Sequence, residues 1–166
     1  HRSARKDMAA RFLFLRNEGG PTRWDASRYF KYLARAESAL PDDLRDLVSE
    51  RRLMLSSPES LWHAQITSLL ANGGRMEIAG VSAGSRTPFW FRYAGVLKVQ
   101  STQVLYHMPS LVIQELVVLR PGVLRHAMVD LGGNMLAVHA RQMSFAWGVA
   151  GGQDNPSGPR PLRGRS

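Results

Sequence analysis

The spacing of apolar residues divides the chain into two parts with different periodicity. In the N-terminal part, apolar positions recur every three or four residues over 25–38, 40–57 and 57–72. After Gly74, apolar residues instead fill short runs that turn residues separate. The pattern therefore predicts an α+β chain, in which a helical N-terminal extension precedes a small β domain.

The first two predicted helices carry acidic residues close to their N-termini. Asp25 can act as the N-cap of the helix over 25–38, whose apolar positions are Tyr29, Phe30, Leu33 and Ala36. In the second helix, over 40–57, Asp42 and Asp43 lie in the first turn, where carboxylates interact favourably with the helix dipole. We interpret these acids as a solvated face and not as a catalytic pair.

The third predicted helix covers residues 57–72. Ser57 can cap it, Pro58 suits its first position, and Asn72-Gly73-Gly74 would end it. Its predicted buried stripe consists of Leu61, Trp62, Ile66, Leu69 and Leu70. His63 has no carboxylate or second histidine at ligand spacing, so we interpret it as a surface or core histidine and not as a metal ligand.

The β domain is predicted to contain five strands, at 75–81, 89–99, 110–119, 123–131 and 135–143. Strands of this length and number indicate a small, strongly bent antiparallel sheet or barrel. Gly132-Gly133-Asn134 reads as a hairpin turn. Because strand neighbours alternate, one face of the second strand carries Phe89, Phe91 and Tyr93 and the other Trp90 and Arg92. We predict that the wholly aromatic face is core.

Charge adds a functional constraint to this outline. The 166 residues carry a formal net charge of +9, and 19 of the 22 basic residues are arginine. An excess of this kind favours a polyanionic partner, either nucleic acid or an acidic membrane face. Arginine binds phosphate through two parallel hydrogen bonds, so an excess of arginine suits an RNA or DNA partner. A GC-rich genome, whose codons favour arginine, is an alternative explanation of the same excess.

The charge is distributed unevenly along the chain. Residues 1–36 carry +6, 37–59 carry −3, 60–149 carry +4 and 150–166 carry +2. We therefore predict a basic N-terminal arm over 1–24, a helical extension over 25–72, a small barrel over 73–148 and a flexible Arg-rich tail over 149–166. The tail is rich in Gly and Pro and almost free of apolar residues.

Several function classes find no support in the sequence. The chain has no Gly-rich phosphate loop, HExxH, GxSxG or paired-carboxylate arrangement, so we expect neither enzymatic activity nor a cofactor or metal site. It has no cysteine, which fits a reducing compartment, and no apolar run long enough for a membrane-spanning helix. Because it begins at His1, we expect a processed or trimmed N-terminus.

The stretch "VLRPGVLRHAMVDL", preceded by "HMPSL", resembles the C-terminal signature of the bacterial-type large-subunit ribosomal protein L-nineteen family. The matching positions are His107, Pro109, Leu111, Val118, Arg120, Gly122, Arg125 and Ala127. Upstream, Tyr93, Gly95 and Val96 are similar to a family strand that ends Phe-Glu-Gly-Val-Val-Ile, and Gly74 falls where the family's first strand opens. The resemblance covers about residues 58–131.

The chain also departs from the family pattern. The family has a long basic segment before its His-Pro motif, and this chain has only "KVQSTQVLY" there. Positions that are often Arg or Lys in the family hold Pro121, Val123, Leu124 and Met128. A reduced RNA contact together with added peripheral segments resembles a mitochondrial member of the family.

The resemblance implies an SH3-like barrel and a structural role in the large subunit of the mitochondrial ribosome, in the matrix. The implied partners are ribosomal RNA, neighbouring ribosomal proteins and, through an intersubunit bridge, the small subunit. One alternative is a protein-binding accessory subunit of another mitochondrial assembly, such as a respiratory complex. Another is a free RNA-binding regulator, which would bind naked RNA without associating with ribosomes.

The predicted nucleic-acid-binding residues lie in the final turn, the strands, the N-terminal arm and the tail. Arg120 and Arg125 are expected to reach phosphate at the final turn, with His126 beside them; the competing interpretation is that they are merely solvent-exposed. The remaining candidates are the strand cations Arg92, Lys98 and Arg141, the arm cations Arg2, Arg5, Lys6, Arg11 and Arg16, and the tail cations Arg160, Arg163 and Arg165. The arm could instead be a remnant of mitochondrial targeting, which is also Arg-rich.

Overall fold

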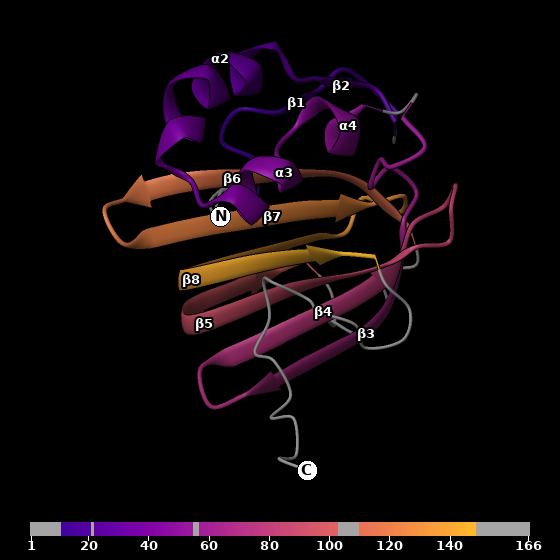
Figure 1. Ribbon diagram of the computed structural model, residues 1–166. Coiled ribbons are helices and arrows are strands. Elements are labelled where there is room, and N and C mark those ends of the chain that lie inside the picture. The colour runs from indigo at the N-terminus through magenta and orange to yellow at the C-terminus, as the bar shows by residue number, and fades with distance from the viewer. Residues whose placement is uncertain (1–10, 21, 55–56, 103–109, 149–166) are drawn as a thin grey trace, which may run out of the picture.

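A computed structural model of the chain describes residues 11–20, 22–54, 57–102 and 110–148. A helical layer comes first, and a sheet follows (Figure 1). The first layer contains β1 (Arg16–Asn17), β2 (Trp24–Asp25), α2 (Ser27–Ala36), a 3-10 turn (Glu37–Ala39), α3 (Asp42–Leu47) and α4 (Glu50–Leu53). The sheet contains β3 (Gln65–Asn72), β4 (Arg75–Val81), β5 (Pro88–Ser101), β6 (Leu111–Arg120), β7 (Val123–Asp130) and β8 (Met135–Trp147).

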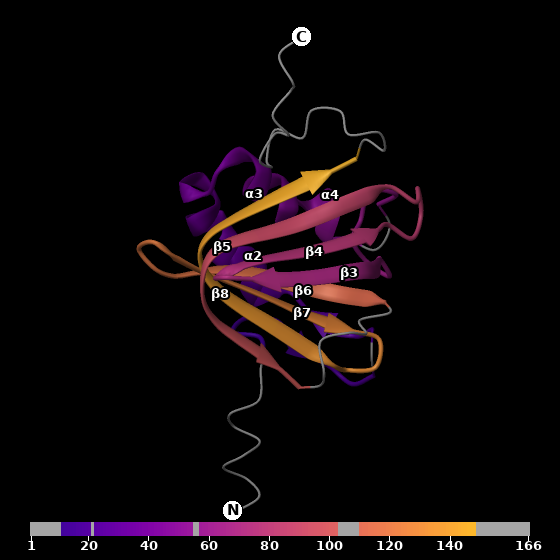
Figure 2. The ribbon, with the colours of Figure 1, turned by 90° about the horizontal axis from the view of Figure 1, so that it is seen from below.

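The six long strands form one antiparallel sheet in the order β3-β4-β5-β8-β7-β6. The long strands β5 and β8 are strongly curved, so the two halves of the sheet turn toward each other (Figure 2). Among the described residues, the two edges meet at a single bridge, where the Leu111 N–H donates to the Ala64 carbonyl at 2.7 Å. The sheet is therefore not closed into a barrel, and the α+β outline is retained.

The predicted third helix is wrong, because the second half of that segment forms β3 and the first half contains turns and no helix. Asn72-Gly73-Gly74-Arg75 joins β3 to β4 as a two-residue hairpin loop, with φ of +56° at Gly73 and +79° at Gly74. Two successive residues with positive φ suit the twist of a hairpin, which glycine allows without a steric cost. Of the predicted buried stripe, Leu61 is buried, whereas Leu70 is 64% exposed.

The first two helical predictions are confirmed in part. The helix α2 buries Tyr29 and Leu33 as expected, but Asp25 precedes the N-cap position and accepts a hydrogen bond from the Ser27 N–H at 2.9 Å. The second segment divides into α3 and α4, because Ser49 adopts an extended conformation and its hydroxyl donates to the Asp46 carbonyl. A serine that bonds to nearby backbone in this way competes with a continuous helix.

The five predicted strands are all present, with ends that differ by a few residues from the prediction. The face assignment in β5 is also confirmed, since Phe89 and Phe91 are fully buried and Tyr93 is 3% exposed. Phe91 packs against the Phe145 ring of β8 at 5.8 Å between centroids. Aromatic side chains from adjacent strands therefore form the centre of the core.

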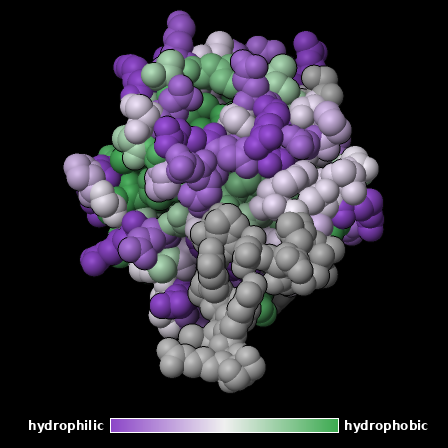
Figure 3. Space-filling view, in the orientation of Figure 1, coloured by the Kyte–Doolittle hydropathy of each residue, from purple (hydrophilic) through white to green (hydrophobic). Residues whose placement is uncertain are grey.

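The helical layer protects the edge of the sheet at β6. The Tyr29 hydroxyl donates to the Leu116 carbonyl at 2.9 Å and accepts from the Leu116 N–H at 2.7 Å. The Tyr32 hydroxyl accepts from the Val118 N–H. These contacts occupy backbone groups that would otherwise be free to pair with another strand. In the space-filling view, hydrophilic side chains cover much of this layer, with hydrophobic ones visible between them (Figure 3).

The predicted boundary between an arm and the folded chain also needs correction. Phe12 and Leu15 are buried in the core, at 5% and 2% exposure, so residues 11–20 belong to the folded unit. Residues 1–10 of the predicted arm and the whole predicted tail, 149–166, lie outside the described residues.

Among the described helices, none has the length and apolarity that crossing a bilayer requires.

Candidate nucleic-acid interface

The hairpin between β6 and β7 places Arg120 at the surface. Pro121 and Gly122 form its loop, and Gly122 has a φ of +77°, a conformation that favours glycine. Arg120 pairs with Val123 across the hairpin and is exposed. This exposure agrees with both interpretations of Arg120, as a phosphate contact and as a solvent-exposed turn residue, so the phosphate contact stays a prediction.

The prediction that Arg125 belongs to an exposed interface is wrong, because only 6% of its side chain is exposed. Its Nη2 donates to the Arg11 carbonyl, and its Nη1 lies 3.7 Å from the Glu115 carboxylate. Burial lowers the pKa of Arg125, and the charge of Glu115 opposes that shift. The side chain thus fastens the N-terminal segment to β7 and is buried, not exposed at the surface.

Glu115 is the partner that explains the position of Arg125. The carboxylate is fully buried and accepts hydrogen bonds from the backbone N–H groups of Leu13, Phe14 and Leu15, at 2.8 to 2.9 Å. A buried carboxylate is stable only when hydrogen bonds and a countercharge replace its water. The lone acid in a largely apolar strand was the sequence signal for this anchor, and its backbone donors lie about 100 residues away.

The prediction that His126 lies beside the surface cations is also wrong, because His126 is 1% exposed and forms part of the core. Its Nε2–H donates to Gln114 Oε1 at 2.5 Å, and the Tyr93 hydroxyl donates to its Nδ1 at 2.6 Å. Gln114 in turn donates from its amide nitrogen to the Leu47 carbonyl, which fixes the orientation of the amide. Burial, together with the charge of Arg125, lowers the pKa of His126 to about 3, so the ring is neutral.

Four of the predicted cations lie near one another around His139. Lys98 of β5 and Arg125 of β7 both pair with His139 of β8, and Arg141 lies two residues further along the same strand. Arg120 is close enough for its charge to lower the pKa of His139. We call the exposed residues Lys98, Arg120 and Arg141, together with the half-buried His139, the cationic surface.

The bend of β5 helps to shape the cationic surface. Gly95 has a φ of +60°, and a Cβ atom there would come within 3.0 to 3.3 Å of the aliphatic atoms of Arg141. The Arg141 side chain therefore lies across the space that the glycine leaves open. On either side of Lys98, Leu97 and Val99 are exposed at 47% and 39%, so apolar atoms border the cations.

The cations of this surface have no ion-pair partner among the described residues. Carboxylates in the described part of the chain are mostly engaged elsewhere, by backbone N–H groups or by other cations: Asp25, Asp42, Asp43, Asp46, Glu59, Glu77, Glu115 and Asp130. These acids are therefore engaged with the backbone or with cations other than Lys98, Arg120 and Arg141. Part of the net charge of +9 lies outside the described residues, and within them exposed residues such as Lys98 and Arg120 carry a charge that no ion pair offsets.

The other predicted contacts have different outcomes. Arg92 forms an ion pair with Glu77 at 2.8 Å and lies over the Trp90 ring at 5.5 Å, so its charge is already balanced. Arg11 and Arg16 are exposed on the N-terminal segment. The remaining predicted contacts lie outside the described residues: Arg2, Arg5, Lys6, Arg160, Arg163 and Arg165.

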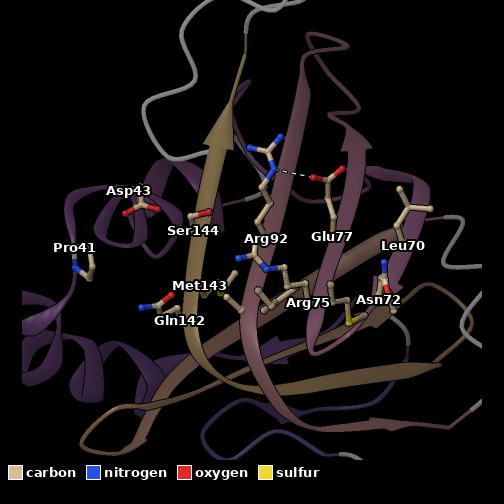
Figure 4. Close-up of a pocket in the computed structure, with 14 residues that line it drawn as sticks. Pro41, Asp43, Leu70, Asn72, Arg75, Glu77, Arg92, Gln142, Met143 and Ser144 are labelled. Atoms are coloured by element: carbon tan, nitrogen blue, oxygen red, sulfur yellow. Dashed lines mark hydrogen bonds and ion pairs between the residues drawn. The ribbon is translucent and has the colours of Figure 1, made fainter. Parts of the chain in front are cut away.

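A second candidate site is a pocket of about 840 Å³ beside β3, β4, β5 and β8. The close-up shows residues from the start of α3 on one side and from the β3–β4 hairpin on the other (Figure 4). Leu70, Met76 and Met143 contribute apolar atoms, and Arg75 and Gln142 contribute polar groups. Because the ion pair of Arg92 and Glu77 lies in its wall, the pocket has no excess of one charge.

Comparisons with protein-family models, with curated proteins and with solved structures found no match to this chain. Within the described ranges, no three His, Asp or Glu side chains are grouped in a way that could hold a metal ion.

Proposed function

We propose that the protein is a structural, RNA-binding component of a ribonucleoprotein particle and performs no chemistry of its own. The observation that carries this proposal is the cationic surface, where Lys98, Arg120 and Arg141 are exposed and form no ion pair among the described residues. Cations held on neighbouring strands can neutralise successive phosphates of a nucleic-acid backbone.

The particle that we propose is the large subunit of the mitochondrial ribosome, near the subunit interface, with ribosomal RNA and neighbouring ribosomal proteins as partners. The resemblance to the L-nineteen family supports this choice, and Arg120 is the motif cation that remains at the surface. We further propose that the curved sheet is a divergent SH3-like barrel. The single bridge between Ala64 and Leu111, where the two sheet edges meet, supports that interpretation.

Retention on ribosomal particles tests this function. In a density gradient, the wild-type protein should migrate with the large subunit, and the variant Lys98→Ala/Arg120→Ala/Arg141→Ala should be lost from it as salt is raised. The matched control is Arg28→Ala/Lys31→Ala/Arg35→Ala. It also removes one lysine and two arginines, but from the exposed side of α2. Equal behaviour of the two variants would remove the cationic surface from the proposal.

A second candidate function is a protein-binding accessory subunit of another mitochondrial complex, such as a respiratory complex. The open edge of β3 favours it: this strand carries no charged residue, and among the described residues it pairs only with β4. An extended strand of a partner protein could add to such an edge by backbone hydrogen bonds. Co-purification with membranes in place of ribosomal particles would favour this function.

A free RNA-binding regulator would use the same cationic surface and differ in its partners. It predicts tight binding to naked RNA and no migration with ribosomal particles. The gradient experiment therefore separates the three functions, because it reports the ribosomal, the membrane-bound and the free protein in one measurement.

A further inference from the structure

The surroundings of His139 are unusual for a histidine on a sheet surface. Its ring is half-buried, and its Nε2 atom is buried and makes no hydrogen bond. The direct cross-strand neighbours of His139 are Lys98 on one side and Arg125 on the other. Arg125 also has a buried nitrogen, Nη1, that makes no hydrogen bond. Two buried nitrogen atoms without a hydrogen bond thus belong to adjacent side chains, and Arg125 Nη1 has the Glu115 carboxylate at 3.7 Å as its ion-pair partner.

The charges that face His139 are mainly positive, whichever element they come from. Lys98 comes from β5, Arg120 from β6 and Arg125 from β7, and the charge of each acts on His139; Arg141 lies two residues further along β8 itself. Arg11, on the N-terminal segment beside Arg125, adds a further exposed cation.

One carboxylate, Glu115, lies near this cluster. It belongs to the next row of the sheet, since it pairs with Ala127, which pairs with Ala137. Its oxygens already accept three backbone N–H groups and face Arg125. The negative charge nearest in the sheet register is therefore engaged with the N-terminal segment and does not offset Lys98 or Arg120.

We propose that a phosphate group of the ligand binds over His139, between Lys98 and Arg120, and that His139 takes up a proton when the phosphate binds. The proposal rests on the proposed function, because it assigns one phosphate-binding position within the cationic surface. The Lys98 ammonium and the Arg120 guanidinium contact the phosphate, and His139 contributes a third positive charge beneath it.

The electrostatics of the unliganded protein agree with this coupling. Burial lowers the pKa of His139, and the charges of Arg125, Lys98 and Arg120 lower it further. The ring is therefore neutral at neutral pH. A phosphate offsets the charges of Lys98 and Arg120, so it raises the pKa of His139, and a group whose pKa rises on binding takes up a proton. Affinity must then increase as the pH falls.

Oligouridylate is a suitable probe, because neither its phosphodiesters nor its base titrates over the pH range of interest. The wild-type protein should bind it more tightly as the pH is lowered from about 7.5 to about 5.5, by up to about tenfold per pH unit. Calorimetry in two buffers of different ionisation enthalpy should show proton uptake on binding. Inorganic phosphate, tested at the same phosphate concentration, distinguishes a polymer-specific position from one that takes any phosphate.

The variants separate the subsite from the wider function. His139→Gln should abolish proton uptake and flatten the pH dependence, whereas His63→Gln, at an exposed histidine, should change neither. Lys98→Met should reduce proton uptake, because losing a neighbouring charge raises the pKa of His139 in the free protein. This second variant reports on the coupling even where His139→Gln disturbs folding.

Two results would overturn the inference in different ways. If His139→Gln binds oligouridylate with an unchanged pH dependence, the subsite is wrong, while a loss of binding in Lys98→Ala/Arg120→Ala/Arg141→Ala leaves the proposed function intact. If the triple variant binds as the wild type does, the cationic surface is not the RNA-binding site, and the subsite is rejected with it.

Discussion

At the scale of the residue, the buried polar side chains act as connectors between distant segments. Glu115 and Arg125 hold the N-terminal segment, and Gln114 joins His126 to the last carbonyl of α3. Each of these groups has lost water, so each requires a complete set of partners. Two side chains that the sequence assigns to RNA binding, Arg125 and His126, are used in this way inside the fold.

The first prediction concerns Phe91, which is fully buried and contacts the rings of Phe89, His126 and Phe145. Phe91→Ala should lower the free energy of unfolding by about 3 to 5 kcal/mol, because it leaves a cavity among rigid rings. Denaturant unfolding measures the change. Trp90→Ala, on the outer side of the same strand, is the control and should cost much less; equal costs would contradict the assignment of Phe91 to the core.

The second prediction follows from the pKa of about 3 that His126 has in the folded protein. In the unfolded chain its pKa is near the ordinary value of about 6.5. Between these values the unfolded state binds more protons, so stability is present above about pH 6.5 and is lost as the pH falls toward 3. Urea midpoints measured over this range in wild type and His126→Leu should show a weaker loss in the variant. A parallel decline in both proteins would assign the acid sensitivity to other groups.

At the scale of the element, local signals predicted the strands and misassigned one hairpin. Period-two alternation and turn residues located β4 to β8, because these signals lie within each strand. In the segment over 57–72, Leu61, Ile66 and Leu69 fit a helical spacing, but the pair Gly73-Gly74 also fits a hairpin loop. The partner strand β4 decides between the two, and pairing with it is a tertiary effect.

The contacts that define the candidate site were less accessible to prediction. The cationic surface depends on the register that places Lys98, His139 and Arg125 in one row, and no local pattern specifies a register across three strands. The sequence named Lys98 and Arg120 as nucleic-acid contacts, and both are exposed in the structure, whereas it missed His139. An isolated histidine in an apolar strand gives no signal of its own until its cross-strand neighbours are known.

The third prediction concerns how α2 covers the edge of β6. Tyr29→Phe removes a hydroxyl that serves both the N–H and the carbonyl of Leu116, leaving two buried backbone groups without a partner. We expect a loss of about 1 to 3 kcal/mol in the free energy of unfolding. Hydrogen exchange at the Leu116 amide should become faster, while exchange at amides between β4 and β5 should be affected only by the global loss. Unchanged protection at Leu116 would show that another group covers the edge.

At the scale of the whole molecule, acidic and basic side chains have separate roles. Carboxylates such as Glu115, Asp130 and Asp43 accept hydrogen bonds from the backbone, and others neutralise Arg51, Arg52 and Arg92. The exposed surface is left with an excess of cations. This division explains how one chain combines a well-connected interior with the long-range attraction that a polyanionic partner requires.

The fourth prediction concerns the N-terminal segment and requires two truncations. A chain lacking residues 1–15 loses Phe12 and Leu15 from the core and leaves the Glu115 carboxylate without its backbone donors, so its unfolding midpoint should drop sharply. A chain lacking residues 1–10 keeps these contacts and loses Arg2, Arg5 and Lys6. The shorter truncation is therefore the informative one for RNA binding.

If the three cations contact ribosomal RNA, removing residues 1–10 should reduce the slope of log affinity against log salt by about 2 to 3, because each neutralised phosphate releases condensed counterions. Retention on large-subunit particles over a salt series measures the slope, and the unfolding midpoint of the same protein shows whether the fold is intact. A slope equal to that of the full chain would favour the interpretation of these residues as a targeting remnant, whose charges are recognised before assembly and not in the particle.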